Sequence, residues 1–118
     1  MERVDIMTVF AVQRQMKFDQ LKGELVERFP SIHKAERYGK IEFLLSPSAS
    51  PFNSEVILGE LHDKLKNYTN DDHLLLIGNP VLIGMAVSIA SFYNSGRVRF
   101  LQWSGKHFEY TEIVAKIY

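Results

Sequence analysis

Residues 71–96 read DDHLLLIGNPVLIGMAVSIASFYNSG and contain the longest apolar run of the chain. Positions 73–77 have the length of a strand, and a continuous apolar run bounded by turn residues is typical of a strand buried on both faces. Asn79 can cap a following helix, and Pro80 suits its first position because no hydrogen-bond donor is needed there. The pattern predicts a buried strand that leads directly into a buried helix over 81–93.

The same run is about as long as a membrane-spanning helix. The Gly-Asn-Pro break at 78–80 argues against a membrane span, because a broken helix in lipid needs neighbouring protein to satisfy its freed backbone groups. We therefore expect a soluble core helix and no membrane partner. The first twelve residues, MERVDIMTVFAV, lack the cationic start and cleavage site of a secretory signal, so we expect a cytoplasmic protein.

Composition limits the classes of function. A chain of 118 residues is long enough for one domain, which we expect to span 1–118. Lys plus Arg and Asp plus Glu number 14 each, so no overall charge attracts nucleic acid. The absence of cysteine excludes disulfides, thiol nucleophiles and thiolate metal sites. The four histidines lack the spacing of a helical metal site, and we expect no metal, no cofactor and no catalytic residues.

Strand and helix patterns alternate through the rest of the chain. The expected elements are a strand over 6–12, an amphipathic helix over 17–28, a short helical turn over 31–38, a strand over 40–45 and a helix capped by Asn53. The helix over 17–28 is predicted from apolar residues at helical spacing, namely Phe18, Leu21, Leu25 and Phe29.

A hairpin is expected at the carboxyl end. Two strands over 97–103 and 106–113 flank Ser104-Gly105, which suits a two-residue turn and would place Trp103 opposite Lys106. The whole alternation predicts an α/β fold: a Rossmann-like layered sandwich with a mostly parallel sheet of about five strands and the antiparallel hairpin at its edge.

In open parallel sheets, ligands bind beyond the carboxyl ends of the strands. Three segments should meet at that edge, namely 13–17, 46–53 and 78–80. Their cations, hydroxyls and helix amino ends have the chemistry of an anion or nucleotide site. The candidate residues are Arg14, Lys17, Ser46, Ser48, Ser50, Asn53, Gly78 and Asn79. In the alternative interpretation, the serines and asparagines only cap helices and shape turns, and neither loop matches a known phosphate-binding motif.

Two further patterns leave alternatives open. One face of the hairpin interleaves cations with aromatic residues, as a platform for single-stranded nucleic acid would: Arg97, Arg99, Leu101, Trp103, Lys106, Phe108 and Tyr110. Zero net charge favours packing of this face against a helix, so nucleic-acid binding is not expected. A stripe of small residues, Gly84, Ser88, Ser91 and Ser95, fits either close packing on the sheet or a helix contact in a homodimer.

Three portions of the chain resemble small proteins encoded by bacteriophages, particularly those of marine bacteria. They are KIEFLLSPSASPF, DDHLLLIGNPVLIGMA and GRVRFLQWSGKHFEYTEI. The resemblance implies an accessory role in infection, such as binding a host factor or a nucleotide, and no particular activity. Our first hypothesis is a non-catalytic binding or regulatory protein whose partner is a protein or a phosphate-bearing small molecule. The alternatives are a small enzyme acting on a phosphorylated metabolite and a single-strand nucleic-acid accessory protein.

Overall fold

The computed structural model describes residues 7–118, so the predicted strand start at Ile6 and the amino-terminal MERVDI lie outside the described residues. Five strands form the main sheet in the order β4-β1-β5-β6-β7. They are β1 (Thr8–Gln13), β4 (Lys40–Leu45), β5 (His73–Leu75), β6 (Arg97–Ser104) and β7 (Glu109–Lys116). Neighbouring strands are parallel except β7, which runs antiparallel to β6 at the edge. The predicted α/β sheet with its carboxyl-terminal hairpin is confirmed.

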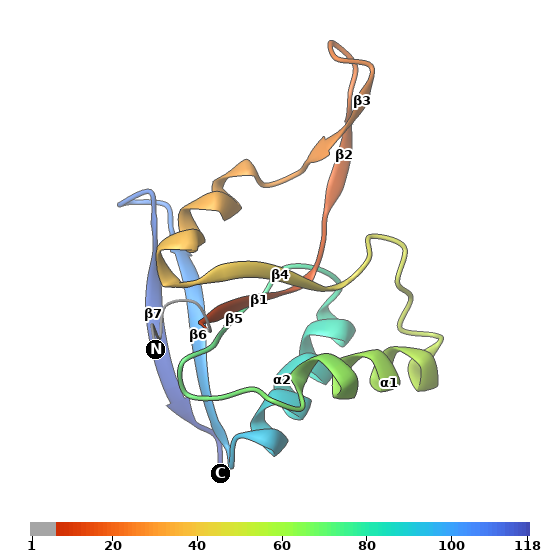
Figure 1. Ribbon diagram of the computed structural model, residues 1–118. Coiled ribbons are helices and arrows are strands. Elements are labelled where there is room, and N and C mark those ends of the chain that lie inside the picture. The colour runs from red at the N-terminus through yellow and green to blue at the C-terminus, as the bar shows by residue number, and fades with distance from the viewer. Residues whose placement is uncertain (1–6) are drawn as a thin grey trace.

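Helices cover both faces of this sheet (Figure 1). The α-helices α1 (Ser54–Leu65) and α2 (Pro80–Tyr93) pack on one face, and the 3₁₀-helix η2 (Pro30–Tyr38) packs on the other. The interior strand β1 is buried on both sides as predicted, because Phe10 and Val12 face the α-helices while Val9 and Ala11 face η2. Within residues 7–118, no helix combines the length and the apolar character needed to span a bilayer.

The start of α2 forms as its sequence predicts. The Asn79 side-chain oxygen accepts hydrogen bonds from the backbone amides of Val81 and Leu82, at 2.8 and 3.4 Å. The prediction of a fully buried helix is wrong on one side, since Gly84, Ser88 and others on that side are exposed. The small-residue stripe therefore faces solvent at these two positions and does not pack on the sheet there.

The predicted amphipathic helix over 17–28 is wrong. This segment forms an antiparallel hairpin of β2 (Met16–Asp19) and β3 (Glu24–Glu27), which we call the arm, and it projects away from the sheet (Figure 1). Turn chemistry prevails over the apolar spacing. The Asp19 carboxylate accepts from the amides of Leu21 and Lys22, and Gly23 supplies the left-handed backbone that closes the turn, with φ of 68°.

The predicted register of the carboxyl-terminal hairpin is also wrong. Trp103 lies opposite Tyr110, not opposite Lys106, because the connection is a longer loop over 105–108. Phe108 closes that loop by donating its amide to the Ser104 carbonyl at 2.8 Å, and it adopts a φ of 53°. The observed register places the rings of Trp103 and Tyr110 5.1 Å apart on the face covered by η2. Burial of these two rings together explains why the longer loop is favoured.

Candidate functional site

The loops that follow β1, β4 and β5 meet around the side chain of Gln13, which is only 4% exposed. Its amide nitrogen donates to the carbonyl oxygens of Ser46, Pro47 and Ala49, at 3.2, 3.4 and 3.1 Å. Its carbonyl oxygen accepts from the Asn79 amide at 2.9 Å. The carboxyl ends of the parallel strands thus come together as expected, and a buried glutamine links all three loops. We call this arrangement the Gln13 clamp.

Gly78 allows the third loop to approach the clamp. Its φ of 121° lies in the region that favours glycine. A Cβ atom at this position would stand 2.5 Å from the Gln13 Cβ, a distance that would force the backbone apart. The role of Gly78 in the structure is therefore close packing within the Gln13 clamp.

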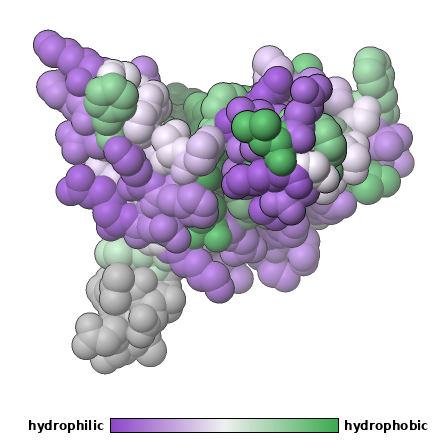
Figure 2. Space-filling model, turned by 90° about the horizontal axis from the view of Figure 1, so that it is seen from above, coloured by the Kyte–Doolittle hydropathy of each residue, from purple (hydrophilic) through white to green (hydrophobic). Residues whose placement is uncertain are grey.

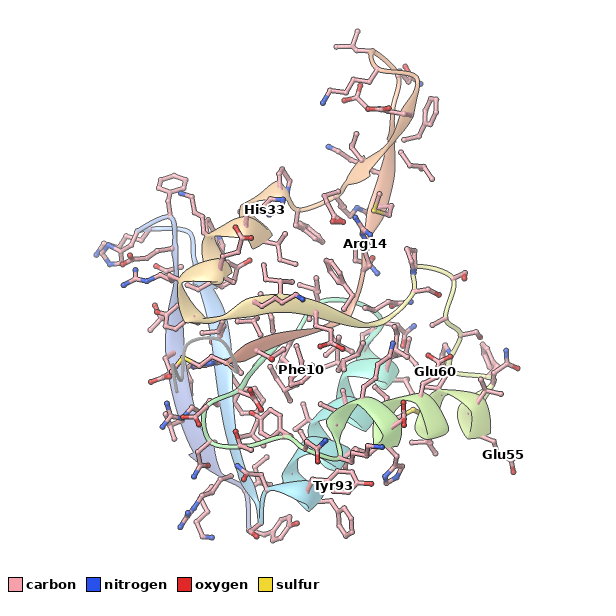
Figure 3. The ribbon with its side chains drawn as sticks, in the orientation of Figure 1. Phe10, Arg14, His33, Glu55, Glu60 and Tyr93 are labelled. Carbon is pink, nitrogen blue, oxygen red and sulfur yellow. The ribbon has the colours of Figure 1, made fainter. Side chains whose placement is uncertain are left out.

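The two predicted cations of the anion site lie in the arm and at its base. The Arg14 guanidinium lies at the base of the arm, where its Nε is 2.8 Å from a Glu27 carboxylate oxygen (Figure 3). It also lies over the Phe43 ring, 5.1 Å from the ring centre, and lines a pocket of about 650 Å³ beside η2. Lys17 is exposed on β2, within the arm. Arg14 is therefore engaged by Glu27 and Phe43, and Lys17 belongs to the arm.

The remaining predicted residues stay near the clamp and have mostly local partners. The hydroxyls of Ser46 and Ser48 are exposed and lie 3.1 Å apart, whereas the Ser50 hydroxyl accepts from the Phe52 amide. Asn53 precedes α1 but its side chain makes no capping bond. Asn79 caps α2. Hydroxyls and helix amino ends do share this edge, and anion binding there stays a prediction.

An apolar pocket of about 610 Å³ opens where β5 ends and β6 continues. Within the described residues, β5 pairs with β6 only through Leu74 and Leu75. Gln102 to Ser104 of β6 therefore extend beyond the last residue that is paired with β5. The lining residues are mostly apolar and include Leu76, Ile77, Phe100, Trp103, Ile113 and, from the segment before η2, Phe29. The sequence does not indicate this pocket, because the apolar run predicts a strand through Ile77, whereas Leu76 and Ile77 lie beyond the end of β5 and line the opening.

The aromatic-basic face of the hairpin is covered in part, whereas Arg97, Lys106 and Phe108 are exposed. Leu101 and Tyr110 are buried beneath η2, and Trp103 packs edge-on against Tyr110. The Lys34 ammonium lies 5.8 Å from the centre of the Trp103 ring and donates to the Phe108 carbonyl. For Leu101, Trp103 and Tyr110 these contacts match the packing interpretation, and the cation over the Trp103 ring comes from η2.

A polar cluster lies at the start of β5, at the end of the strand away from the Gln13 clamp. His73 is buried, and its Nε2 is 2.6 Å from the Glu112 carboxylate on β7. Arg99, on the strand between them, reaches the same oxygen at 3.4 Å, and the Tyr38 ring packs on the imidazole at 5.3 Å. The hydrogen bond from His73 holds the pKa of Glu112 below its ordinary value. The cluster therefore ties three strands together across the sheet.

Glu112→Gln should destabilise the protein at neutral pH and have less effect in acid. Because the folded state lowers the pKa of Glu112, its carboxylate contributes stability above its ordinary value of 4.5, and this contribution is lost as pH falls through the lowered pKa. The measurement is the difference in unfolding free energy between wild type and variant across pH 3–7.

Burial raises the pKa of Asp72 in the wild type and in the variant alike. The pH dependence that Asp72 gives to stability therefore cancels in the difference between the two proteins. A difference that stays constant or grows on acidification would contradict the ion-pair account of the cluster.

The arm displays apolar side chains far from both cores. Leu21 at the tip is 100% exposed, and Phe18 and Leu25 are 61% and 63% exposed. The last two form a cross-strand pair, so they lie side by side on one face of the arm. Figure 2, which looks down on the molecule, shows apolar surface at the arm surrounded by polar residues. In sequence these positions look like the buried stripe of a helix, and Gly23 is the signal that indicates a turn instead.

A protein-family model described as Phage Pam3 gp32-like protein matches residues 7–117. The chain belongs to this family. The match covers the arm, the Gln13 clamp and the carboxyl-terminal hairpin, and it confirms the resemblance to small phage-encoded proteins. Neither the curated proteins nor the solved structures contain a match to this Phage Pam3 gp32-like chain.

Proposed function

We propose that the chain is a non-catalytic phage accessory protein that binds a partner protein through its arm. The observation that carries this proposal is the exposure of Phe18, Leu21 and Leu25 on a hairpin that projects from the sheet. An isolated two-stranded hairpin is at best marginally stable in water, and β2 and β3 do not pack extensively on the main sheet. A partner that covers the apolar face would stabilise the arm and gain a compact aromatic and aliphatic anchor.

The base of the arm is fixed. The Arg28 amide donates to the Gln15 carbonyl at 2.9 Å, and the ion pair between Arg14 and Glu27 joins the strand that leaves the sheet to the strand that returns. Arg14 is also held over Phe43 of β4. A fixed base with a free tip presents the apolar face in a defined direction, which lowers the entropic cost of binding.

The charges on the arm indicate what kind of partner surface would bind it. Cations and anions on and beside the two strands are interspersed and nearly balance: Arg14, Lys17, Lys22 and Arg28 against Asp19, Glu24 and Glu27. We therefore expect an apolar groove on the partner protein and binding that depends weakly on salt. Nucleic acid would require the steep salt dependence that follows from neutralising phosphates.

Photo-crosslinking tests the proposal. A photoreactive residue in place of Leu21 should give one discrete adduct with a protein from phage-infected cells, and the adduct should disappear in the Phe18→Ser/Leu25→Ser variant. A photoreactive residue in place of Asn67, which is exposed after α1, is the matched control position. Equal labelling from both positions, or an adduct that survives the double substitution, would refute the role of the arm.

A second candidate function is anion or nucleotide binding beside the Gln13 clamp. The chain passes from β1 to β4 on one side and then to β5 on the other side of β1. Rossmann-like proteins bind ligands where the strand order reverses in this way. The exposed hydroxyls of Ser46 and Ser48 and the amino end of α2 support this candidate, while the engagement of Arg14 with Glu27 weighs against it. Phosphate or a nucleotide at a hundred times its dissociation constant would add about 2.7 kcal/mol of stability, which a thermal-shift measurement detects. No shift at millimolar concentrations would rule this candidate out.

A further inference from the structure

The strand β7 has an open edge. It is the last strand in the sheet order and, among the described strands, pairs only with β6. It is eight residues long and contains no proline, and Val114 near its centre is 62% exposed. Proteins usually shorten or interrupt such edges, because unpaired amides and carbonyls recruit another strand.

Backbone directions show which groups of β7 point outward. The Arg99 amide donates to the Tyr68 hydroxyl at 3.2 Å, so it points away from β7. Arg99 lies directly opposite Val114, and opposing residues in an antiparallel pair exchange both backbone bonds or neither. The amide and carbonyl of Val114 therefore point away from β6. The Ile117 amide donates to the Gly96 carbonyl, which agrees with inward groups at odd positions and outward groups at even positions.

We propose that a second copy of this chain pairs with the edge of β7 in antiparallel orientation and extends the sheet. A two-fold axis perpendicular to the sheet preserves its faces, so residues that oppose each other must share the same face. Centring the axis on Glu112 or on Lys116 would oppose identical charges. Centring it on Val114 places Glu112 of each copy opposite Lys116 of the other.

This register pairs the outward backbone groups and the side-chain charges of β7 at the same time. The even-numbered residues Glu112, Val114 and Lys116 would exchange backbone hydrogen bonds with the second copy. The contacts of His73 and Arg99 with Glu112 both use its Oε2, so Oε1 can accept from Lys116 of the second copy. Zero net charge also imposes no general repulsion between copies.

The mass in solution tests the pairing. Light scattering should give twice the 13.6 kDa of one chain. Val114→Pro removes an outward amide without touching the bonds to β6, and it should weaken the dimer roughly thirtyfold through loss of the two central hydrogen bonds. Val114→Thr, which keeps the amide and the β-branched shape, should leave the dimer intact. A monomeric wild type at all concentrations would overturn the proposal.

Single cysteines test the register in a chain that has none of its own. Val114→Cys should form a covalent dimer on oxidation, because residues that oppose each other lie about 5.5 Å apart between Cα atoms. Thr111→Cys should not, because the two copies of this position would be about 20 Å apart. Equal crosslinking at both positions would overturn the register. The Phe18→Ser/Leu25→Ser variant should remain dimeric, which separates this edge from the arm.

Discussion

Replacing Gln13 with alanine should lower the free energy of unfolding by about 2–4 kcal/mol. The substitution removes one buried side chain that bonds three carbonyl oxygens of the loop after β4 and the Asn79 amide of the loop after β5. Those groups are partly buried, so they lose their partner without gaining full access to water. Urea denaturation followed by circular dichroism measures the change.

Gln15→Ala is the matched control, because Gln15 lies two residues further along and, within residues 7–118, its side chain bonds only the neighbouring Arg14 carbonyl. We expect a change within about 0.5 kcal/mol for this variant. Equal effects of the two substitutions would show that the Gln13 clamp is not a main source of stability at this edge.

The Phe18→Ser/Leu25→Ser variant should weaken binding of the partner protein by at least about a hundredfold, since buried aromatic and aliphatic anchors each contribute 1–2 kcal/mol or more. Its unfolding free energy should stay within about 0.5 kcal/mol of wild type, because both side chains are already exposed in the chain alone. Titration against the crosslinked partner and urea denaturation provide the two readouts.

Lys17→Ser/Val26→Ser is the control for this pair. These residues also oppose each other on β2 and β3, but they lie on the other face of the arm. We expect this variant to bind the partner within a few-fold of wild type. Equal losses in both variants would mean that the arm has only a scaffolding role.

Local signals were enough to predict the core of the fold. The apolar run at 73–77 and the Asn79-Pro80 start of α2 are specified within a few residues; the structure has the start of α2 as predicted and a strand that ends at Leu75, two residues earlier than predicted. The parallel sheet with an antiparallel edge follows from the alternation of strands and helices. Here short-range chemistry and long-range packing favour the same conformation.

The arm and the hairpin register depend on interactions that local patterns do not contain. Phe18, Leu21 and Leu25 have helical spacing, yet the turn at Asp19 and Gly23 decides the conformation. Trp103 takes Tyr110 as its partner because η2, distant in sequence, covers both rings. Neither outcome is visible in a window of neighbouring residues.

The candidate site, too, could be predicted from the sequence only in part. Parallel topology correctly brings together the loops after β1, β4 and β5. It does not determine where side chains point, and Arg14 turns to Glu27 because the arm places that carboxylate within reach. The sequence does not single out Gln13, because one glutamine at a strand end gives no signal of its own.

Amide hydrogen exchange of the arm tests the central claim most directly. In the free chain, amides of β2 and β3 should exchange far faster than those of β1, because the core does not cover the arm. With the partner protein bound, the amides of β2 and β3 should slow markedly while those of β1 stay unchanged. Amides of β2 and β3 that are as protected as β1 in the free chain, or that do not respond to the partner, would contradict the arm as the binding element.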